Sequence, residues 1–194
     1  MFVQVMQGKV GDRELLDRQM TAWNRDVRPG AIGFLGSTGG ISPDGQVIVI
    51  ARFADEESAR RNSARPEQSA WWEATAPAFG GDVTFHDCSQ IDEMFSGGSD
   101  KAGFVQVMQG RAADPEKMRE MGRSMEDELR SQRPDLLGGI VAWHGDREFT
   151  QVNYFTSEAD ARKGEAEMDE APGDWMALMD GPITFIDLPE PMLL

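Results

Sequence analysis

Histidine and cysteine, the residue types that most often carry catalysis or bind metals, are scarce in this sequence. His86 and His144 are its two histidines, and Cys88 is its one cysteine. They form no H-x3-H or C-x2-C spacing and no nucleophile motif, so the sequence predicts no metal site and no internal disulfide. The glycine-rich Gly36–Gly40 (GSTGG) lacks the lysine of a phosphate-binding loop. Any chemistry must therefore depend on amide, aromatic and hydroxyl side chains.

Several side chains, most of them in the first half of the chain, have the chemistry to hold a flat, oxygen-bearing ligand. Asn62 offers an amide that can hydrogen-bond to an oxygen, while Trp71 and Trp72 offer stacking area and an N–H donor. Arg52 could hold an anionic oxygen, and Trp175 corresponds to Trp72 in the second half. Each has a structural alternative: an exposed helix position for Asn62, core positions for the tryptophans and a carboxylate partner for Arg52.

Polar side chains also interrupt a strand in the second half of the chain. Gln151 and Asn153 fall on one face of the segment FTQVNYF, and Tyr154 falls on the other. Trp143 and His144 end the preceding strand. Polar groups in a covered strand cost free energy unless they are hydrogen-bonded, so these residues are predicted either to bind a ligand or to make polar contacts within the protein. For His144 the alternative is an exposed position beside a turn.

An internal repeat indicates how these residues are positioned. The heptapeptide FVQVMQG begins at Phe2 and again at Phe104. Two further matches follow in the same order and at nearly the same spacing: ARFADEESAR (51–60) with NYFTSEADAR (153–162), and VTF (83–85) with ITF (183–185). Three ordered matches indicate duplication of a whole unit. The sequence predicts two copies of one domain, at residues 1–95 and 103–194, joined by a flexible linker at residues 96–102.

Hydrophobic periodicity predicts the same order of elements in each copy. In the first copy the expected strands are 2–8, 33–41, 46–53 and 82–88, with helices after Asp12 and from Asp55 to about Phe79, the latter broken near Pro66. In the second copy the expected strands are 104–110, 138–144, 148–155 and 183–188, with helices at 114–132 and about 157–180. The order β-α-β-β-α-β is the ferredoxin-like, α+β arrangement. Residues 91–95 are expected to pack on the second copy.

The charge of the chain excludes several classes of partner. Its 194 residues include 34 Asp and Glu and 19 Lys and Arg, for a formal net charge of −15. Such a chain repels phosphate backbones, so we expect no nucleic-acid partner. No apolar run reaches the roughly 18 residues of a membrane span, and no signal peptide precedes the first strand. A single cysteine fits a reducing compartment, so the sequence predicts a soluble, cytoplasmic protein.

The order of elements and three local features resemble the antibiotic biosynthesis monooxygenase (ABM) type of domain in the dimeric α/β-barrel superfamily. The features are the opening FVQVMQG, a strand ending in RF before a helix that opens DEESARRN, and a broken second helix that ends in an aromatic-rich stretch. In that superfamily two domains pack sheet against sheet, usually as a homodimer. The resemblance implies that the two copies pair in this way within one chain, as an intrachain dimeric α/β barrel, with further homo-oligomerisation left open.

The resemblance also implies a function. ABM-type domains often carry a polar residue before the helix break, where this chain has Asn62, and related enzymes place a tryptophan against a flat aromatic ligand. A monooxygenase of this type needs no cofactor and would act with O2 on a small aromatic or polyketide-like substrate. Trp72 or Trp175 would stack on the substrate, and Asn62, Asn153 or Tyr154 would bind its oxygens. The other candidate side chains would contribute to substrate binding.

Two other functions fit the same fold. A non-catalytic protein that binds a small apolar ligand, or acts as a structural partner, is the alternative to the monooxygenase. It is supported by the structural roles open to most candidate residues and by the divergence of the two copies at these positions. The absence of an obvious general base weakens the monooxygenase, which we still take as the first hypothesis. Haem degradation is disfavoured, because the enzymes of that class hold iron with a histidine on the second helix and neither second helix here contains one. An oxygenase pocket should be closed and aromatic with a few converging polar groups, whereas a structural protein should have filled pockets.

Overall fold

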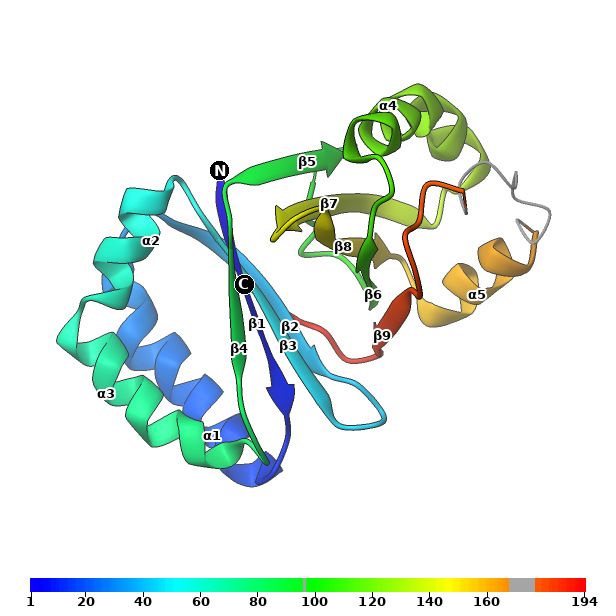
Figure 1. The fold of residues 1–194 in the computed structure, drawn as a ribbon. Helices are drawn as coiled ribbons and strands as arrows, with labels where there is room; N and C mark the ends of the chain where they lie inside the picture. Colours follow the sequence, from blue (N-terminus) through cyan, green and yellow to red (C-terminus); the bar gives the residue numbers. More distant parts are fainter. Residues whose placement is uncertain (96, 168–176) are drawn as a thin grey trace. The chain divides into compact units, whose positions relative to one another are not determined.

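The computed structural model describes residues 1–95, 97–167 and 177–194 (Figure 1). The described chain forms two compact units, Met1–Ser89 and Gln90–Leu194. This division falls ahead of the predicted domain end at residue 95, because Gln90–Met94 forms a strand that pairs within the second unit. The apolar residues before the predicted linker therefore belong to the second sheet, as the sequence indicated.

The strands of the first unit lie in the order β2-β3-β1-β4, and each is antiparallel to its neighbours. They are β1 (Phe2–Lys9), β2 (Phe34–Ile41), β3 (Gln46–Phe53) and β4 (Thr84–Cys88). A tight turn joins β2 to β3, in which Gly45 has a φ of +82° and its N–H donates to the Ser42 carbonyl oxygen at 2.9 Å. Glycine favours such a backbone conformation, so the sequence SPDG at residues 42–45 forms the turn between the two predicted strands 33–41 and 46–53.

The helices of the first unit lie on one face of its sheet (Figure 1). They are α1 (Arg13–Ala22), α2 (Glu56–Ser63) and α3 (Pro66–Thr75). The Asp12 carboxylate caps α1 by accepting a hydrogen bond from the Leu15 N–H at 2.9 Å, and Asp55 caps α2 by accepting one from the Ser58 N–H at 2.7 Å. The predicted break falls between α2 and α3, where Pro66 has no N–H to continue the helix.

Strand alternation decides which side chains of this sheet face the helices. Gln4 lies opposite Ala51, and Met6 lies opposite Val49, in the ladder between β1 and β3. Met6 packs against the buried core around Leu16 of α1, so this set of alternate residues points toward the helices. The intervening residues of the same strands point to the opposite face.

The second unit repeats this arrangement with one additional strand. Its sheet has the order β5-β7-β8-β6-β9, and all neighbouring strands are antiparallel. The strands are β5 (Gln90–Met94), β6 (Phe104–Arg111), β7 (Leu136–His144), β8 (Glu148–Phe155) and β9 (Thr184–Leu188). The short β10 (Met192–Leu193) follows in the chain and is not a strand of this sheet. Gln106 lies opposite Asn153 and Met108 opposite Gln151, which is the register of the first unit. The predicted α+β class with two ferredoxin-like units is confirmed.

Within residues 97–167 and 177–194, two helices pack on one face of the second sheet. They are α4 (Pro115–Gln132) and α5 (Glu158–Glu167). Met118 of α4 belongs to a buried cluster with Met108 and Phe149, and Ala161 of α5 belongs to one with Phe104. Residues 168–176 of the predicted helix at about 157–180 lie outside the described residues.

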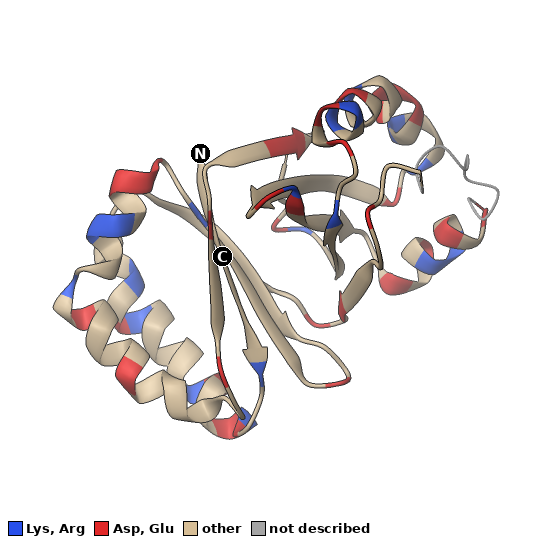
Figure 2. Cartoon of the chain, viewed as in Figure 1, with Lys and Arg blue, Asp and Glu red and all other residues tan. Residues whose placement is uncertain are grey.

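Charged side chains gather on the helices and the connecting segments, while the strands carry few of them (Figure 2). The acidic excess of the sequence is thus carried mainly by surfaces in contact with water, which is where isolated charges are least costly. In the described part of the chain, no helix is both long enough and apolar enough to cross a membrane.

Two glycines of the second unit provide a matched pair of substitutions. A Cβ at Gly138 would lie 2.1 Å from the Gly97 carbonyl oxygen, whereas a Cβ at Gly122 in α4 would meet nothing within 4 Å. We expect Gly138→Ala to destabilise the protein by about 1–3 kcal/mol because backbone must move. Gly122→Ala should stabilise it by about 0.5–1 kcal/mol through helix propensity. Urea denaturation followed by circular dichroism measures both, and an unchanged midpoint for Gly138→Ala would contradict the close approach of residue 97.

The cap of α2 has a pH dependence that can be measured directly. Hydrogen bonds from the Ser58 backbone N–H and hydroxyl lower the pKa of the Asp55 carboxyl below its usual value. Because the folded-state pKa is depressed, this stabilisation is complete above the unfolded pKa of about 3.9 and is lost as the pH falls through the folded pKa. A carbon-detected NMR titration should give Asp55 a pKa below about 3.9.

The same cap can be tested by substitution. The melting temperature of the wild type should exceed that of Asp55→Asn at pH 7, and the difference should shrink as the pH falls through the Asp55 pKa. Asp82→Asn removes the same charge from an exposed site and should show no such narrowing. An Asp55 pKa at or above the usual value would show that the cap does not stabilise α2 in this way.

Candidate functional site

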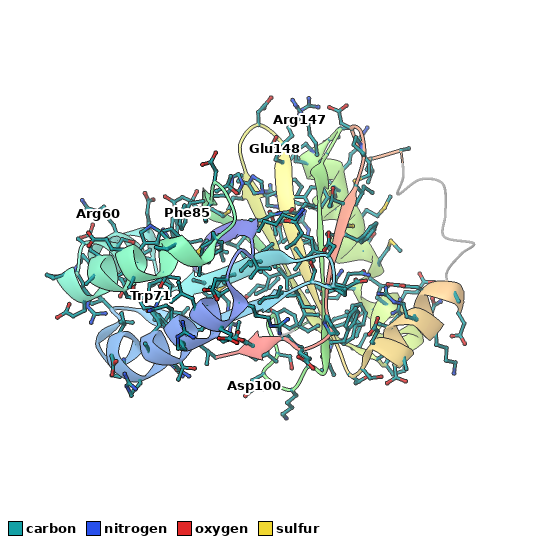
Figure 3. The ribbon with its side chains drawn as sticks, turned by 90° about the horizontal axis from the view of Figure 1, so that it is seen from below. Arg60, Trp71, Phe85, Asp100, Arg147 and Glu148 are labelled. Atoms are coloured by element: carbon teal, nitrogen blue, oxygen red, sulfur yellow. The ribbon has the colours of Figure 1, made fainter. Side chains whose placement is uncertain are left out.

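A cavity of about 380 Å³ lies in the first unit, between the helix-facing side of its sheet and the helices. Side chains of β1, β2, β3 and β4 line it on one side, and side chains of α2, α3 and the end of α1 line it on the other. Figure 3 shows two of the lining residues, Trp71 of α3 and Phe85 of β4. The volume lies within the range of small-molecule binding sites.

Six aromatic rings line the cavity in an unbroken series of contacts. In order they are Phe53, Phe34, Trp23, Trp71, Trp72 and Phe85. The distances between successive ring centroids are 5.8, 5.2, 6.3, 6.2 and 5.2 Å. Tilted and edge-to-face contacts of this kind hold each ring in a fixed orientation, so the rings form a rigid apolar wall. Phe85 is 54% exposed and marks where this wall meets the surface.

Amide side chains supply much of the polar lining. Asn62 is only 4% exposed, and its Oδ1 accepts a hydrogen bond from Arg65 Nη1 at 3.1 Å. Gln68 Oε1 accepts a hydrogen bond from Trp23 Nε1 at 3.0 Å. The third amide, Gln4 of β1, is held by a carboxylate of β4 at 2.8 Å. Three amides with fixed positions therefore lie among the aromatic rings.

Ionisable groups are nearly absent from the lining. Of the described residues around the cavity, Glu73 is the one with an ionisable side chain, and it is exposed on α3. His86 lies next to Phe85 but pairs with Val5, so alternation turns it to the other face of the sheet. No group of three or more His, Cys, Asp or Glu side chains within the described residues is arranged to hold a metal ion. The cavity offers stacking and hydrogen bonds rather than a buried general base.

Three of the predicted site residues meet at this cavity: Asn62, Trp71 and Trp72. Asn62 is buried, so the alternative of an exposed helix position is wrong. Trp71 is anchored by its indole N–H, which donates to the Gln19 carbonyl oxygen at 2.8 Å. Trp72 also packs against the core around Phe79. The two roles considered for Trp72, lining a pocket and filling the core, therefore occur in the same side chain.

Arg52 lies away from this cavity. It is paired with Val3 in the ladder between β1 and β3, and both residues alternate with those that face the helices. The prediction that Arg52 holds a substrate oxygen is therefore not met at this cavity, because its side chain leaves the sheet on the opposite face.

In the second unit, three further predicted residues are engaged by their neighbours. Gln151 and Asn153 share the helix-facing side, as the alternation predicted, and the Gln151 amide donates to Asn153 Oδ1 at 2.9 Å. The Trp143 indole N–H donates to Asp92 Oδ2 at 2.6 Å, and the Arg119 guanidinium lies 5.3 Å from the Trp143 ring centroid. Their observed contacts correspond to the alternative of polar contacts within the protein.

The remaining predicted residues do not join this set. Tyr154 and His144 lie on the opposite face of the second sheet, in alternation with Asn153 and Trp143. His144 Nε2 lies 3.1 Å from the Thr150 hydroxyl oxygen, so the histidine is held within the strand pair rather than exposed at the turn. Asn153 and Tyr154 therefore do not converge on one ligand position. Trp175 lies outside the described residues.

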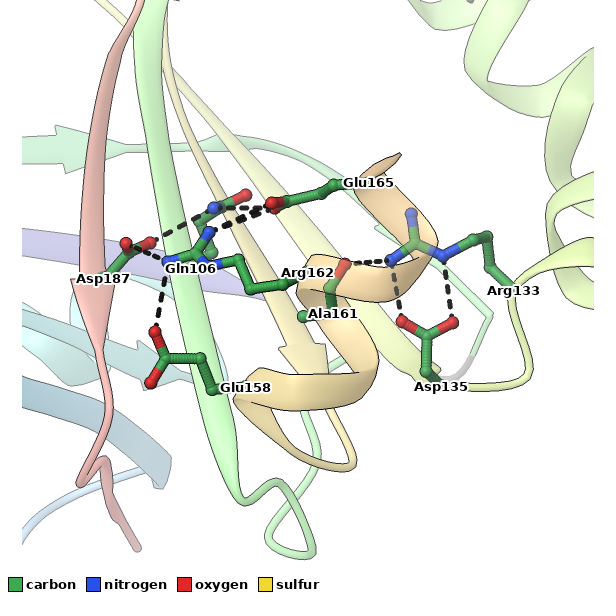
Figure 4. Close-up of polar contacts among 8 residues, drawn as sticks. All are labelled: Gln106, Arg133, Asp135, Glu158, Ala161, Arg162, Glu165 and Asp187. Atoms are coloured by element: carbon green, nitrogen blue, oxygen red, sulfur yellow. Dashed lines mark hydrogen bonds and ion pairs between the residues drawn. The ribbon is translucent and has the colours of Figure 1, made fainter. Parts of the chain in front are cut away.

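A charged network occupies the helix-facing side of the second sheet (Figure 4). The Gln106 amide donates to Glu165 Oε1 at 3.0 Å and to Asp187 Oδ1 at 3.2 Å. Arg162 pairs with Glu165 at 3.1 Å and also contacts Asp187 and Glu158. Burial opposes the charged form of Arg162, but its hydrogen bonds to Glu165 and Asp187 outweigh burial and raise the pKa of Arg162 above its usual value.

The repeat shows what this network replaces. Gln106 and Glu165 stand where the first unit has Gln4 and Ser63, both of which line the cavity. Gly164 stands where the first unit has Asn62. A Cβ at Gly164 would lie 2.3 Å from Arg133 Nε, and Arg133 forms a buried ion pair with Asp135 at 2.7 Å (Figure 4). The second unit thus places charged side chains at positions that line open space in the first.

Several lining residues were not predicted from the sequence, among them Trp23, Phe34, Phe53 and Gln68. A signal existed for Trp23, which directly follows α1 and continues the apolar spacing of Leu16 and Met20, a pattern that predicts a side chain facing the sheet. No local pattern distinguishes Gln68 from an exposed helix residue.

No protein-family model and no curated protein matches this sequence. Solved structures of similar fold exist. One, described as a putative monooxygenase from Lactobacillus acidophilus, has a TM-score of 0.73 at 11% identity, covering 100% of this chain and 98% of that chain. An anthrone oxidase-like protein has a TM-score of 0.63 at 11% identity, covering 99% and 92%. A Listeria monocytogenes ferredoxin-fold protein related to antibiotic biosynthesis monooxygenases has a TM-score of 0.52 at 12% identity, covering 97% and 95%.

At these identities the likeness concerns the fold, and it extends over both units of the chain. The strand ladders of this chain give each unit an antiparallel sheet, and the sequence repeat predicts the same order of elements in both units. The chain therefore shares the fold of these structures, with two ferredoxin-like units in succession.

Proposed function

We propose that the first unit is a cofactor-independent monooxygenase that acts with O2 on a small aromatic substrate. The observation that carries this proposal is the 380 Å³ cavity with its series of aromatic rings and three fixed amides. A flat aromatic molecule can exchange water contacts for ring contacts along the whole wall. The amides can fix the orientation of its oxygen atoms.

The reaction requires a substrate that supplies its own electrons. A CH2 group activated by neighbouring phenol or carbonyl groups loses a proton, either to water or to Glu73 at the rim of the cavity. The carbanion gives one electron to O2, and the two radicals combine to form a C–O bond. Loss of water from the resulting hydroperoxide leaves a carbonyl, so the CH2 group and O2 become C=O and H2O. Amide donors such as Asn62 stabilise the negative oxygen that develops as the proton leaves.

A protein that binds an aromatic ligand without turning it over is the second candidate. One observation favours it: the described lining contains a single ionisable side chain, Glu73, and that side chain is exposed. A general base commonly contributes about 10²–10⁴-fold to a proton abstraction, and this cavity does not bury one. Oxygen consumption separates the two candidates.

Binding and turnover can be measured together with anthrone, a hydroquinone and haemin as probes. Three of the five tryptophans, Trp23, Trp71 and Trp72, line the cavity, so a bound aromatic probe should quench intrinsic fluorescence. We expect anthrone to quench and to consume oxygen. Trp72→Phe should raise the Kd by about 3- to 10-fold through lost ring contact. Asn62→Ala should lower the rate of oxygen uptake by about 10²-fold, with a smaller effect on Kd.

Trp143→Phe provides the matched control, because it removes a tryptophan that lies in the second unit and not in this cavity. It should leave the anthrone Kd and oxygen uptake unchanged even though it loses the hydrogen bond to Asp92. Quenching without oxygen uptake would replace the monooxygenase with the binding protein. Absence of quenching by anthrone and the hydroquinone would remove both proposals for this cavity.

A further inference from the structure

The three amides that line the cavity share one feature. Each is hydrogen-bonded to a group that can only donate or can only accept a hydrogen bond. An amide has a donor end and an acceptor end of nearly equal shape, so its orientation is set by its partners. A partner that can only donate must bind the oxygen, and a partner that can only accept must bind the nitrogen. The end that remains is the end available to a ligand.

Asn62 is held by a donor. The Arg65 guanidinium has no acceptor, so the Asn62 atom at 3.1 Å from Arg65 Nη1 is the oxygen. Arg65 is itself anchored, because the same Nη1 donates to the Val27 carbonyl oxygen at 3.1 Å and its side chain is only 16% exposed. The Asn62 amide nitrogen has no hydrogen-bond partner among the described residues, so a donor is left for the cavity.

Gln68 and Gln4 are oriented by the same rule but with opposite results. The Trp23 indole N–H only donates, so it binds Gln68 Oε1 at 3.0 Å and leaves the Gln68 amide nitrogen free for a ligand. The Asp87 carboxylate only accepts, so it binds Gln4 Nε2 at 2.8 Å and leaves the Gln4 carbonyl oxygen. Among the amides, those on the helices thus contribute two donors to the lining, and the one on β1 contributes an acceptor. The Ser37, Ser63 and Ser69 hydroxyls also line the cavity and can rotate to donate or to accept.

We propose that Arg65, Trp23 and Asp87 are positioning residues that make the cavity selective for the hydrogen-bonding pattern of its ligand. The preferred ligand is a flat aromatic molecule with an acceptor oxygen toward α2 and α3 and an N–H or O–H group toward β1. This inference rests on the proposed binding of an aromatic molecule in the first unit. It adds which edge of that molecule must accept hydrogen bonds and which must donate them.

The described residues of the second unit do not repeat this pattern. There the Gln106 amide nitrogen is shared between Glu165 and Asp187, and Glu165 replaces the small Ser63 of the first unit. Gly164 removes the counterpart of the Asn62 amide altogether. One chain should therefore bind one such ligand through this pattern.

Three tricyclic probes of matched outline test the inference on the full chain. Acridone has a carbonyl on one edge and an N–H on the opposite edge, xanthone replaces that N–H by a ring oxygen, and anthracene has no polar group. Fluorescence titration should give acridone the lowest Kd, about 3- to 30-fold below that of xanthone, with anthracene the weakest. The reason is that the xanthone ring oxygen meets the Gln4 carbonyl oxygen, which leaves two acceptors facing each other.

Reversal of one amide provides the decisive variant. In Asp87→Lys the new ammonium can only donate, so Gln4 must turn its oxygen toward residue 87 and its nitrogen toward the cavity. The advantage of acridone over xanthone should then disappear or invert, while the Kd of anthracene stays unchanged. Asp82→Lys makes the same change of charge at an exposed site without contact to Gln4 and should preserve the wild-type order.

Arg65 is tested separately because it orients a different amide. Arg65→Met should raise the Kd values of acridone and xanthone by the same factor, about 3- to 10-fold, and leave the Kd of anthracene unchanged. Arg65→Lys should restore most of the lost affinity. If the role of Arg65 were purely structural, Arg65→Met would raise the Kd values of all three probes, anthracene included.

The outcomes separate this inference from the function on which it rests. Equal Kd values for the three probes, or an unchanged preference in Asp87→Lys, would overturn the selectivity but leave an aromatic cavity. Absence of binding by every probe would overturn the aromatic ligand, and the selectivity with it.

Discussion

The register of β1 against β3 is the constraint on which the candidate site depends. It places Gln4 opposite Ala51 and Met6 opposite Val49, and these side chains form the part of the cavity beneath the helices. A slip of one residue would exchange the two faces of the strands and bring Arg52 under α3. The cavity stays open because Ala51 is small and because the rings, in contact with one another, keep the helices at a distance from the sheet.

The two units have the same backbone arrangement but different side chains between sheet and helices: the first has a cavity there, and the second has a polar and ionic network. Asn153 occupies the register position of Ala51, and Glu165 occupies that of Ser63, so polar side chains extend from both sides of the second unit. Buried polar groups must be hydrogen-bonded, and Gln106, Arg162 and their carboxylate partners satisfy one another. The ring-lined cavity of the first unit therefore has room for a ligand. In the second unit the side chains of the ionic network hydrogen-bond to one another and so contribute to internal packing.

The chemistry available to the first unit follows from what its lining contains. Rings and amides provide binding energy and orientation, and they stabilise charge that develops on a ligand oxygen. Because the described lining buries no ionisable group, the reaction proposed above requires a substrate that is itself acidic. In that proposal the protein holds the substrate in an apolar space where an anionic oxygen meets fixed donors in place of water.

Local signals in the sequence determined the duplication, the capping residues Asp12 and Asp55, the break at Pro66 and the sharing of a face by Gln151 and Asn153. Each of these depends on neighbours within a few residues or on direct comparison of the two copies. Only the tertiary structure decided that Gln68 and Phe34 join Asn62 at one cavity and that Arg52 does not. Alternation divides a strand into two faces, but which face the helices cover, and how far above it they lie, is set by packing between segments distant in sequence.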